Sequence, residues 1–145
     1  MGQFCCMKQQ QSSTWGFRSI SFWMTLPVAA GIIIVGFGFF IDPAGWSRNF
    51  GIPFCEGKVQ LYGNVKGIRD MFSGLIFLYL LWIRARRTTA VLFSMAILIP
   101  LTDCITVGIA NGLGDQVHLW IHGGTALYML MTGILLFRGG NHVAG

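Results

Sequence analysis

The chain has 145 residues, of which 54% are hydrophobic and only 10% are charged. A soluble domain normally carries about a quarter charged residues, so this chain cannot cover its surface with polar side chains, and lipid is its natural solvent. The length allows one domain, and the net charge of +5 does not predict a nucleic-acid partner, because the basic residues follow a membrane pattern.

Four apolar stretches lie along the chain, each close to the ~20 residues that a helix needs to cross a ~30 Å hydrocarbon core. We expect transmembrane helices at about 21–41, 64–83, 88–110 and 117–137. The runs are too long and too evenly apolar for barrel strands. The sequence therefore predicts an all-α, integral membrane four-helix bundle over residues 21–138, with polar tails at 1–20 and 139–145. The first run exceeds the ~7–15 residues of a signal-peptide core, so we expect it to be retained.

The N-terminal tail begins with M-G-Q-F-C-C, which is similar to an acylated N-terminus. Cys6 stands where the myristoylation pattern requires Ser or Thr, so that pattern is not met. The sequence leaves open whether Cys5 and Cys6 are palmitoylated or are plain thiols.

The longest predicted connection follows the first span and begins with D-P-A-G-W-S-R-N-F. Asp42 followed by Pro43 is typical of a helix N-cap with proline at the first helical position. Trp46 and Phe50 then favour a short helix at the level of the lipid headgroups, where aromatic residues gather. We interpret this helix as an interfacial anchor, with a lid as the alternative, since long loops in compact proteins are often functional.

Lysine and arginine residues gather on one predicted side of the membrane. The side that carries both termini has no Asp or Glu and holds Lys8, Arg18, Arg84, Arg86, Arg87 and Arg138. The bias of Lys and Arg in loops sets the orientation of a membrane protein, so both termini are predicted to be cytoplasmic. The expected partner is the lipid bilayer, and the expected localisation is that of a multi-pass integral membrane protein.

The second span begins with three charges, Lys66, Arg69 and Asp70. A helix that began after Asp70 would cover only ~20 Å before Arg84, which is short of the hydrocarbon core. We therefore expect the helix to begin at Asn64, with Lys66 snorkelling outward. Asp70 then lies ~9 Å below the non-cytoplasmic surface.

The third and fourth spans bring further ionisable groups to a similar depth. Asp103 is ~12 Å from the same surface and His122 is ~8 Å from it, and His118 precedes His122 by one helical turn. Pro100 cannot donate a hydrogen bond to Ala96, so the third span should kink just before Asp103. Six glycines are expected to allow close helix packing: Gly31, Gly36, Gly38, Gly74, Gly123 and Gly124.

Ionisable residues inside a membrane indicate a functional site by default. We expect Asp70 and Asp103 to act as acid and base, Arg69 to orient them, and His122 or His118 to assist. Burial and a shared arginine can give two carboxyl groups different protonation states. Such a set favours cofactor-independent acid–base chemistry on a lipophilic small molecule, as hydrolase or as isomerase and cyclase, with epoxide opening as the candidate reaction.

Three other interpretations stay open. In the first, the polar cluster is purely structural, a clamp between helices of a non-catalytic protein. Chains of Asp and His also serve as proton or ion relays in membranes. A metal held by His118, His122 and Asp103 is a further alternative, because the histidines have helical ligand spacing.

The order of several motifs resembles the DUF4267 family of small four-span membrane proteins. The motifs are Pro43 and Gly51 after the first span, then K-G-I-R-D at 66–70, L-I-P-L-T-D at 98–103 and H-L-W-I-H-G-G at 118–124. The resemblance covers about residues 21 to 138. It implies the four-span fold and a membrane location, and it links the chain to fungal polyketide pathways, where epoxide hydrolysis or cyclisation is proposed for similar proteins. The resemblance assigns no role to individual residues.

Overall fold

The computed structural model describes residues 15–53 and 59–138, and these residues form six helices and no strand. The helices are α1 (Ile20–Ile41), α2 (Pro43–Phe50), α3 (Val59–Trp82), α4 (Arg86–Ala96), α5 (Leu98–Asn111) and α6 (Gln116–Arg138). The predicted all-α class is therefore confirmed for the part of the chain that the structure describes. The predicted tails and Cys5 and Cys6 lie outside the described residues, apart from residues 15–20 at the inner end of the N-terminal tail.

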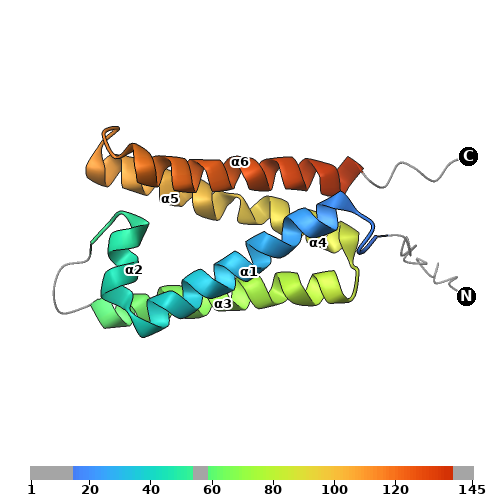
Figure 1. Ribbon diagram of the computed structural model, residues 1–145, viewed down its shortest axis with the longest axis horizontal. Helices are drawn as coiled ribbons and strands as arrows, with labels where there is room; N and C mark the ends of the chain where they lie inside the picture. The colour runs from blue at the N-terminus through green and yellow to red at the C-terminus, as the bar shows by residue number, and fades with distance from the viewer. Residues whose placement is uncertain (1–14, 54–58, 139–145) are drawn as a thin grey trace, which may run out of the picture.

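Four long helical segments run side by side along the molecule, and α2 lies across one end of them (Figure 1). Helix α1 packs along α3, and α5 packs along α6. Contacts of α6 with α1 and α4, and of α4 with α3, join the two pairs. The first residues of α1 and the last residues of α6 lie at the same end of the molecule, opposite α2 (Figure 1).

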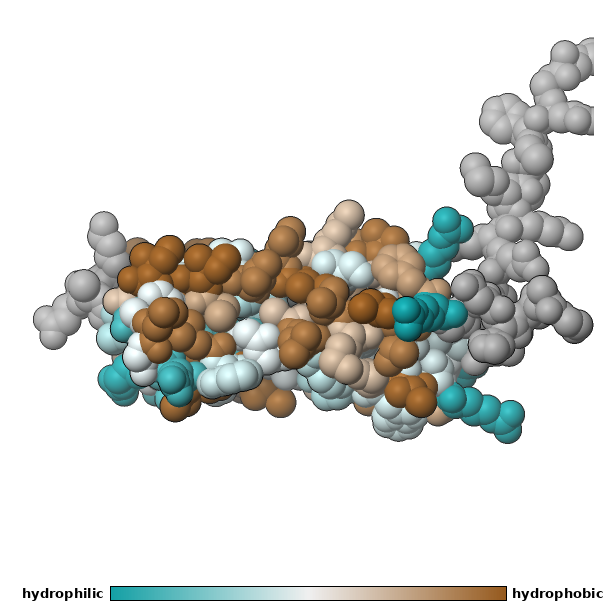
Figure 2. Space-filling view, turned by 90° about the horizontal axis from the view of Figure 1, so that it is seen from above, coloured by the Kyte–Doolittle hydropathy of each residue, from teal (hydrophilic) through white to brown (hydrophobic). Residues whose placement is uncertain are grey.

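Three segments are long and apolar enough to cross a membrane among the residues that the structure describes: Ile20–Ile41, Arg86–Asn111 and Gln116–Arg138. The fourth predicted span lies within α3, which is 24 residues long. Every 18-residue stretch of α3 contains Lys66, Arg69 and Asp70, which sets α3 apart from the other three segments. Figure 2 shows hydrophobic residues along the flank and hydrophilic residues mostly toward the two ends. This is the surface of a membrane protein.

The start of α3 differs from the predicted helix start. The helix begins at Val59, five residues before Asn64, because Gly63 continues the helix instead of preceding it. Gly63 packs against Pro43 and the Phe39 carbonyl oxygen, so its role is close contact between elements.

The third predicted span is divided. Helix α4 ends at Ala96, Ile97 interrupts the helix, and α5 begins at Leu98. This distortion lies where the missing donor of Pro100 predicts it, three residues upstream of the proline.

Helix α2 begins as its sequence predicts. The Asp42 side chain accepts a hydrogen bond from the Gly45 amide at 2.8 Å, and Pro43 occupies the first position. Gly51 ends the helix with a left-handed φ of 98°, a conformation that glycine adopts without steric cost.

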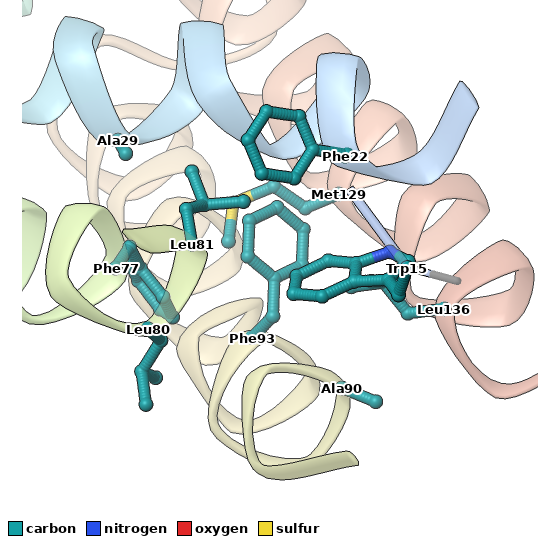
Figure 3. Packing of buried hydrophobic residues seen from close by; sticks show 10 residues of the cluster. All are labelled: Trp15, Phe22, Ala29, Phe77, Leu80, Leu81, Ala90, Phe93, Met129 and Leu136. Carbon is teal, nitrogen blue, oxygen red and sulfur yellow. The ribbon is translucent and has the colours of Figure 1, made fainter. Parts of the chain in front are cut away.

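A buried hydrophobic cluster holds the bundle together at the end opposite α2. Figure 3 shows how aromatic and aliphatic side chains from α1, α3, α4 and α6 meet there, with Trp15 covering them from outside α1. Phe93 is fully buried and stacks edge-on against Phe77 at 5.3 Å. Because this cluster fills only one end, the helix pairs are left with space between them toward α2.

Candidate functional site

A cavity of about 660 Å³ lies between the α1–α3 pair and the α5–α6 pair, on the side of the molecule that α2 covers. Its walls are mainly apolar, with side chains such as Val28, Ile32 and Met129. Two carboxyl groups, one lysine and one histidine are among the polar side chains of its lining: Asp70, Asp103, Lys66 and His122. Three separate helices, α3, α5 and α6, supply these four groups.

Lys66 and Asp70 form an ion pair on α3. Lys66 Nζ lies 3.0 Å from Asp70 Oδ2, and both residues are buried, with exposed fractions of 5% and 7%. The Lys66 ammonium also lies over the rings of Phe39 and Phe50, at 5.1 and 4.8 Å from their centroids. The prediction that Lys66 snorkels outward is therefore wrong. Residues four apart share one helix face, so Lys66 turns inward with Asp70.

Arg69 completes the pairing of Asp70 from the outside. Its Nη2 atom lies 3.1 Å from Asp70 Oδ1, but its side chain is 54% exposed. Arg69 is not part of the cavity lining. The structure thus pairs Asp70 with two cations, one inside the bundle and one on its surface.

Asp103 is the carboxylate that faces the cavity without a partner. Among the described residues its side chain takes part in no hydrogen bond or ion pair, although Lys66, His122 and Arg69 are near enough to act on it electrostatically. Asp103 is half-buried and lies in α5, six residues after the break at Ile97. Asp70, Asp103 and His122, which the sequence places at a similar depth in the membrane, therefore line one cavity.

His122 is held by the end of α2. Its Nε2 atom lies 3.0 Å from the carbonyl oxygen of Phe50, and its ring packs against the Phe50 ring at 4.6 Å. A carbonyl oxygen can only accept a hydrogen bond, so Nε2 carries the hydrogen. In the neutral form this leaves Nδ1 as an acceptor, which is a suitable arrangement for a proton-transfer group.

His118 is not in the cavity lining. Its Nδ1 atom lies 2.7 Å from Asp115 Oδ1, and Asn111 donates a hydrogen bond to the same carboxylate at 2.6 Å. These hydrogen bonds, from His118 first and from Asn111 second, hold the pKa of Asp115 below its ordinary value. The sequence placed His118 beside the other ionisable groups, whereas the structure directs it to the α5–α6 turn.

A network at this turn fixes the end of α2. Asn111 donates to the Gly51 carbonyl oxygen at 2.6 Å, and a Cβ added to Gly51 would lie 2.8 Å from the His118 ring. Together with the His122 bond to Phe50, these contacts tie α2 to both α5 and α6. The predicted short helix is thus packed over the cavity, with Phe50 as part of its wall.

Sequence reasoning missed two residues of this site, Lys66 and Tyr128. Lys66 was placed outside, although its spacing of four from Asp70 was the signal for a pair on one face. Tyr128 also lines the cavity and donates a hydrogen bond to the Met24 carbonyl oxygen at 3.0 Å. No sequence pattern marked Tyr128, since its role depends on how α6 approaches α1.

Within the described residues, no three His, Cys, Asp or Glu side chains are arranged to hold a metal ion. The set of His118, His122 and Asp103 is therefore not formed as a ligand group. The physical reason is that the His118 ring pairs with the Asp115 carboxylate, outside the cavity lining.

The fold and the site together define a class: an all-α membrane protein with a cavity between its helices and ionisable groups in the cavity wall. Residues 29–136 match the family model described as a domain of unknown function, DUF4267. The chain belongs to the DUF4267 family, and the matched stretch contains Lys66, Asp70, Asp103 and His122 of the cavity. No curated protein and no solved structure matched the chain.

Proposed function

We propose that this chain is a four-span membrane enzyme that carries out acid–base chemistry, without a cofactor, on a lipophilic small molecule in the cavity. The observation that carries the proposal is the unpaired Asp103 carboxylate, which shares a mainly apolar cavity with His122 and the Lys66–Asp70 pair. Cavities of ~300–1,000 Å³ accept drug-sized ligands, so a volume of about 660 Å³ suits a small molecule of this kind.

The proposed fourth span is α3. A helix of 24 residues reaches ~36 Å, which is enough to cross the hydrocarbon core. Its charges are compatible with a membrane because Lys66 and Asp70 neutralise one another inside the bundle, and Arg69 pairs with Asp70 from the surface. Four spans place both termini on one side, and Arg18, Arg84, Arg86, Arg87 and Arg138 make that side the cytoplasmic one.

Tags at the two ends of the full chain test this topology. Protease protection in sealed vesicles should place both tags on the same, cytoplasmic side. Tags on opposite sides would instead mean that three helices span and that α3 does not.

The proposed reaction is the opening of an epoxide by water or by a hydroxyl group of the substrate itself. Asp103, as carboxylate, takes a proton from the attacking oxygen while that oxygen forms a bond to an epoxide carbon. The carbon–oxygen bond of the ring breaks, and protonated His122 donates its proton to the leaving oxygen. Water gives a diol and an internal hydroxyl group gives a cyclic ether. Transfer of the proton from Asp103 back to His122 restores the starting state.

The remaining charged groups hold this arrangement in place. Asp70 forms ion pairs with Lys66 and Arg69, so we assign it the role of positioning the Lys66 ammonium. That ammonium can stabilise the negative charge that develops on the epoxide oxygen. Arg69 acts on Asp70 from outside, and His118 acts through the network that fixes α2.

Two alternatives make different predictions. If the polar cluster is only structural, changes in it should lower stability without a separate effect on turnover. Conduction of protons or ions is disfavoured by the hydrophobic cluster around Phe93, which fills the bundle at the end opposite α2. Flux through proteoliposomes that an Asp103→Asn variant abolishes would support conduction instead.

The experiment that tests the proposal is turnover of an epoxide panel by purified full-length protein in nanodiscs. Aryl and fused-ring epoxides are incubated in ¹⁸O-labelled water, and labelled diols or rearranged ethers are detected by mass spectrometry. Asp103→Asn should reduce turnover at least about a hundredfold, the usual size of a general acid–base contribution, and leave the thermal transition in place. Ser73→Ala is the matched control, since Ser73 lines the same cavity but bonds only to the Arg69 carbonyl oxygen. Turnover by Asp103→Asn that equals the wild-type value would refute the assignment.

A further inference from the structure

Two glycines in the cavity wall differ from the other helical glycines of the bundle. A Cβ atom added to Gly31 of α1 or to Gly124 of α6 would meet nothing within 4 Å, and both residues line the cavity. By contrast, a Cβ atom on Gly36 or Gly67 would lie 2.6 or 2.7 Å from a carbonyl oxygen of the facing helix. Close helix packing, which the sequence predicted for Gly31 and Gly124, therefore explains Gly36 but neither of these two.

The two open glycines lie at a similar depth in the bundle. Gly31 is ten residues, or ~15 Å, from the end of α1 at Ile41, and Gly124 is eight residues, or ~12 Å, from the start of α6 at Gln116. They belong to the two helix pairs that form the opposite walls of the cavity. Both walls thus lack a side chain at about the same level, which leaves space between α1 and α6 there.

The dimensions of the cavity indicate what fits there. Its lining extends along α1 from Pro27 to Val35, eight residues or ~12 Å. A volume of about 660 Å³ over this length gives a mean cross-section of about 55 Å². This is much wider than one extended alkyl chain, and it suits a molecule with fused or branched rings.

We propose that Gly31 and Gly124 determine the specificity of the site by admitting a broad, rigid ring system between α1 and α6. The ring system lies against the apolar walls, and its reactive oxygen faces Asp103. The orientation of the reactive oxygen rests on the proposed function, whereas the selection for a broad molecule rests on the cavity alone. Leucine at either position fills the space between the walls and leaves room only for a narrow chain.

Photolabelling of the full-length protein in nanodiscs tests this proposal. The probes are a phenanthrene-based and a dodecanol-based alcohol, each carrying a diazirine, and labelled residues are mapped by mass spectrometry. Gly31→Leu and Gly124→Leu should lower phenanthrene labelling of the cavity residues at least about tenfold, in line with the cost of overpacking. Dodecanol labelling should fall less than about twofold. Ile34→Trp adds volume on the exposed face of α1 and is the control, expected to change neither.

Unchanged phenanthrene labelling in both leucine variants would overturn the proposal, and so would an equal loss of both probes. If a leucine variant loses its thermal transition, Gly31→Ala/Gly124→Ala replaces it, because methyl groups meet no atoms there. That variant should lower phenanthrene labelling by about threefold, and no change would count against the proposal. Asp103→Asn separates the two claims: it should keep phenanthrene labelling while it abolishes turnover. If no epoxide is turned over, the proposed reaction fails, and the labelling still decides the role of the glycines.

Discussion

Removing Asp70 should destabilise the bundle far more than removing either of its cationic partners. The Lys66 Nζ and Asp70 Oδ2 atoms are 3.0 Å apart and both residues are almost fully buried, so the Asp70→Asn variant removes the carboxylate that directly pairs with the buried Lys66 ammonium. Their direct attraction is about 5.5 kcal/mol at an effective dielectric constant of ~20, and breaking a buried pair typically costs about 3–5 kcal/mol. We therefore expect Asp70→Asn to lower the free energy of unfolding by about 3–5 kcal/mol.

The two cations should differ from one another. Lys66→Met leaves Asp70 paired with Arg69 at 3.1 Å, so its cost should be about 1–3 kcal/mol. Arg69→Met removes a side chain that is 54% exposed, and exposed pairs contribute about 0–1 kcal/mol. The double variant Lys66→Met/Asp70→Leu carries no buried charge, so it should be close to the wild-type stability.

Reversible unfolding in mixed detergent and SDS micelles measures these differences as free energies. A double-mutant cycle over Lys66 and Asp70 then isolates their coupling, provided each variant keeps its helical circular dichroism. The reasoning is refuted if Asp70→Asn costs less than about 1 kcal/mol, or if Lys66→Met costs more than Asp70→Asn. Either result would mean that Lys66 reaches solvent, as the sequence first indicated.

Three further predictions concern packing and pH. Gly67→Leu should destabilise the protein by about 1–3 kcal/mol or more in the same unfolding assay, because a Cβ atom there lies 2.7 Å from the Gly36 carbonyl oxygen; equal stability would show that α1 and α3 can separate freely. Gly31→Ala should instead leave the stability unchanged or raise it by up to about 1 kcal/mol, since the methyl group meets no atom within 4 Å and alanine is the better helix former. A clear loss of stability would contradict the open space beside Gly31 in the cavity wall. Hydrogen bonds from His118 and Asn111 hold the pKa of Asp115 below its ordinary 3.8, so ionised Asp115 stabilises the fold above that pH. Thermal melting from pH 6 downward should show this contribution falling as the pH drops below ~4, and the Asp115→Asn variant should lack it. Identical pH profiles for the wild type and the variant would refute the assignment.

Several parts of the fold could be predicted from the sequence because they depend on local chemistry. The length of each apolar run marked the four long helical segments, and the pair Asp42–Pro43 marked the start of α2. Pro100 marked the interruption at Ile97, since a missing donor acts on the residues of the preceding turn.

Other parts depended on tertiary packing and could not be predicted in this way. The direction of the Lys66 side chain is set by the Phe39 and Phe50 rings, which reach it from α1 and α2. A depth count along α3 places Lys66 near a surface but does not fix the rotation of the helix. His118 was assigned to the site by its spacing from His122, while Asp115 competes for its ring across one turn.

The roles of the glycines also could not be predicted from the sequence alone. Gly31 and Gly36 look alike in the sequence, and both lie in the apolar run of α1. Only the approach of α3 separates them, because Gly36 faces the backbone of α3 and Gly31 faces the cavity. Sequence composition therefore predicted small residues at helix contacts, but not which of them leave space for a ligand.

The most direct test of the central claim is the reactivity of Asp103 toward dicyclohexylcarbodiimide, an apolar reagent that modifies carboxyl groups in apolar surroundings. Full-length protein in nanodiscs is treated with the reagent, and the modified residue is mapped by mass spectrometry. We expect modification of Asp103, which has no partner among the described residues, and not of Asp70, whose two carboxylate oxygens are each engaged in an ion pair, with Lys66 and with Arg69. Phenanthrene methanol should protect Asp103 by occupying the cavity. Modification of Asp70 alone, or of Asp103 with no protection by the ligand, would contradict a ligand cavity with an acid–base carboxyl group in its wall.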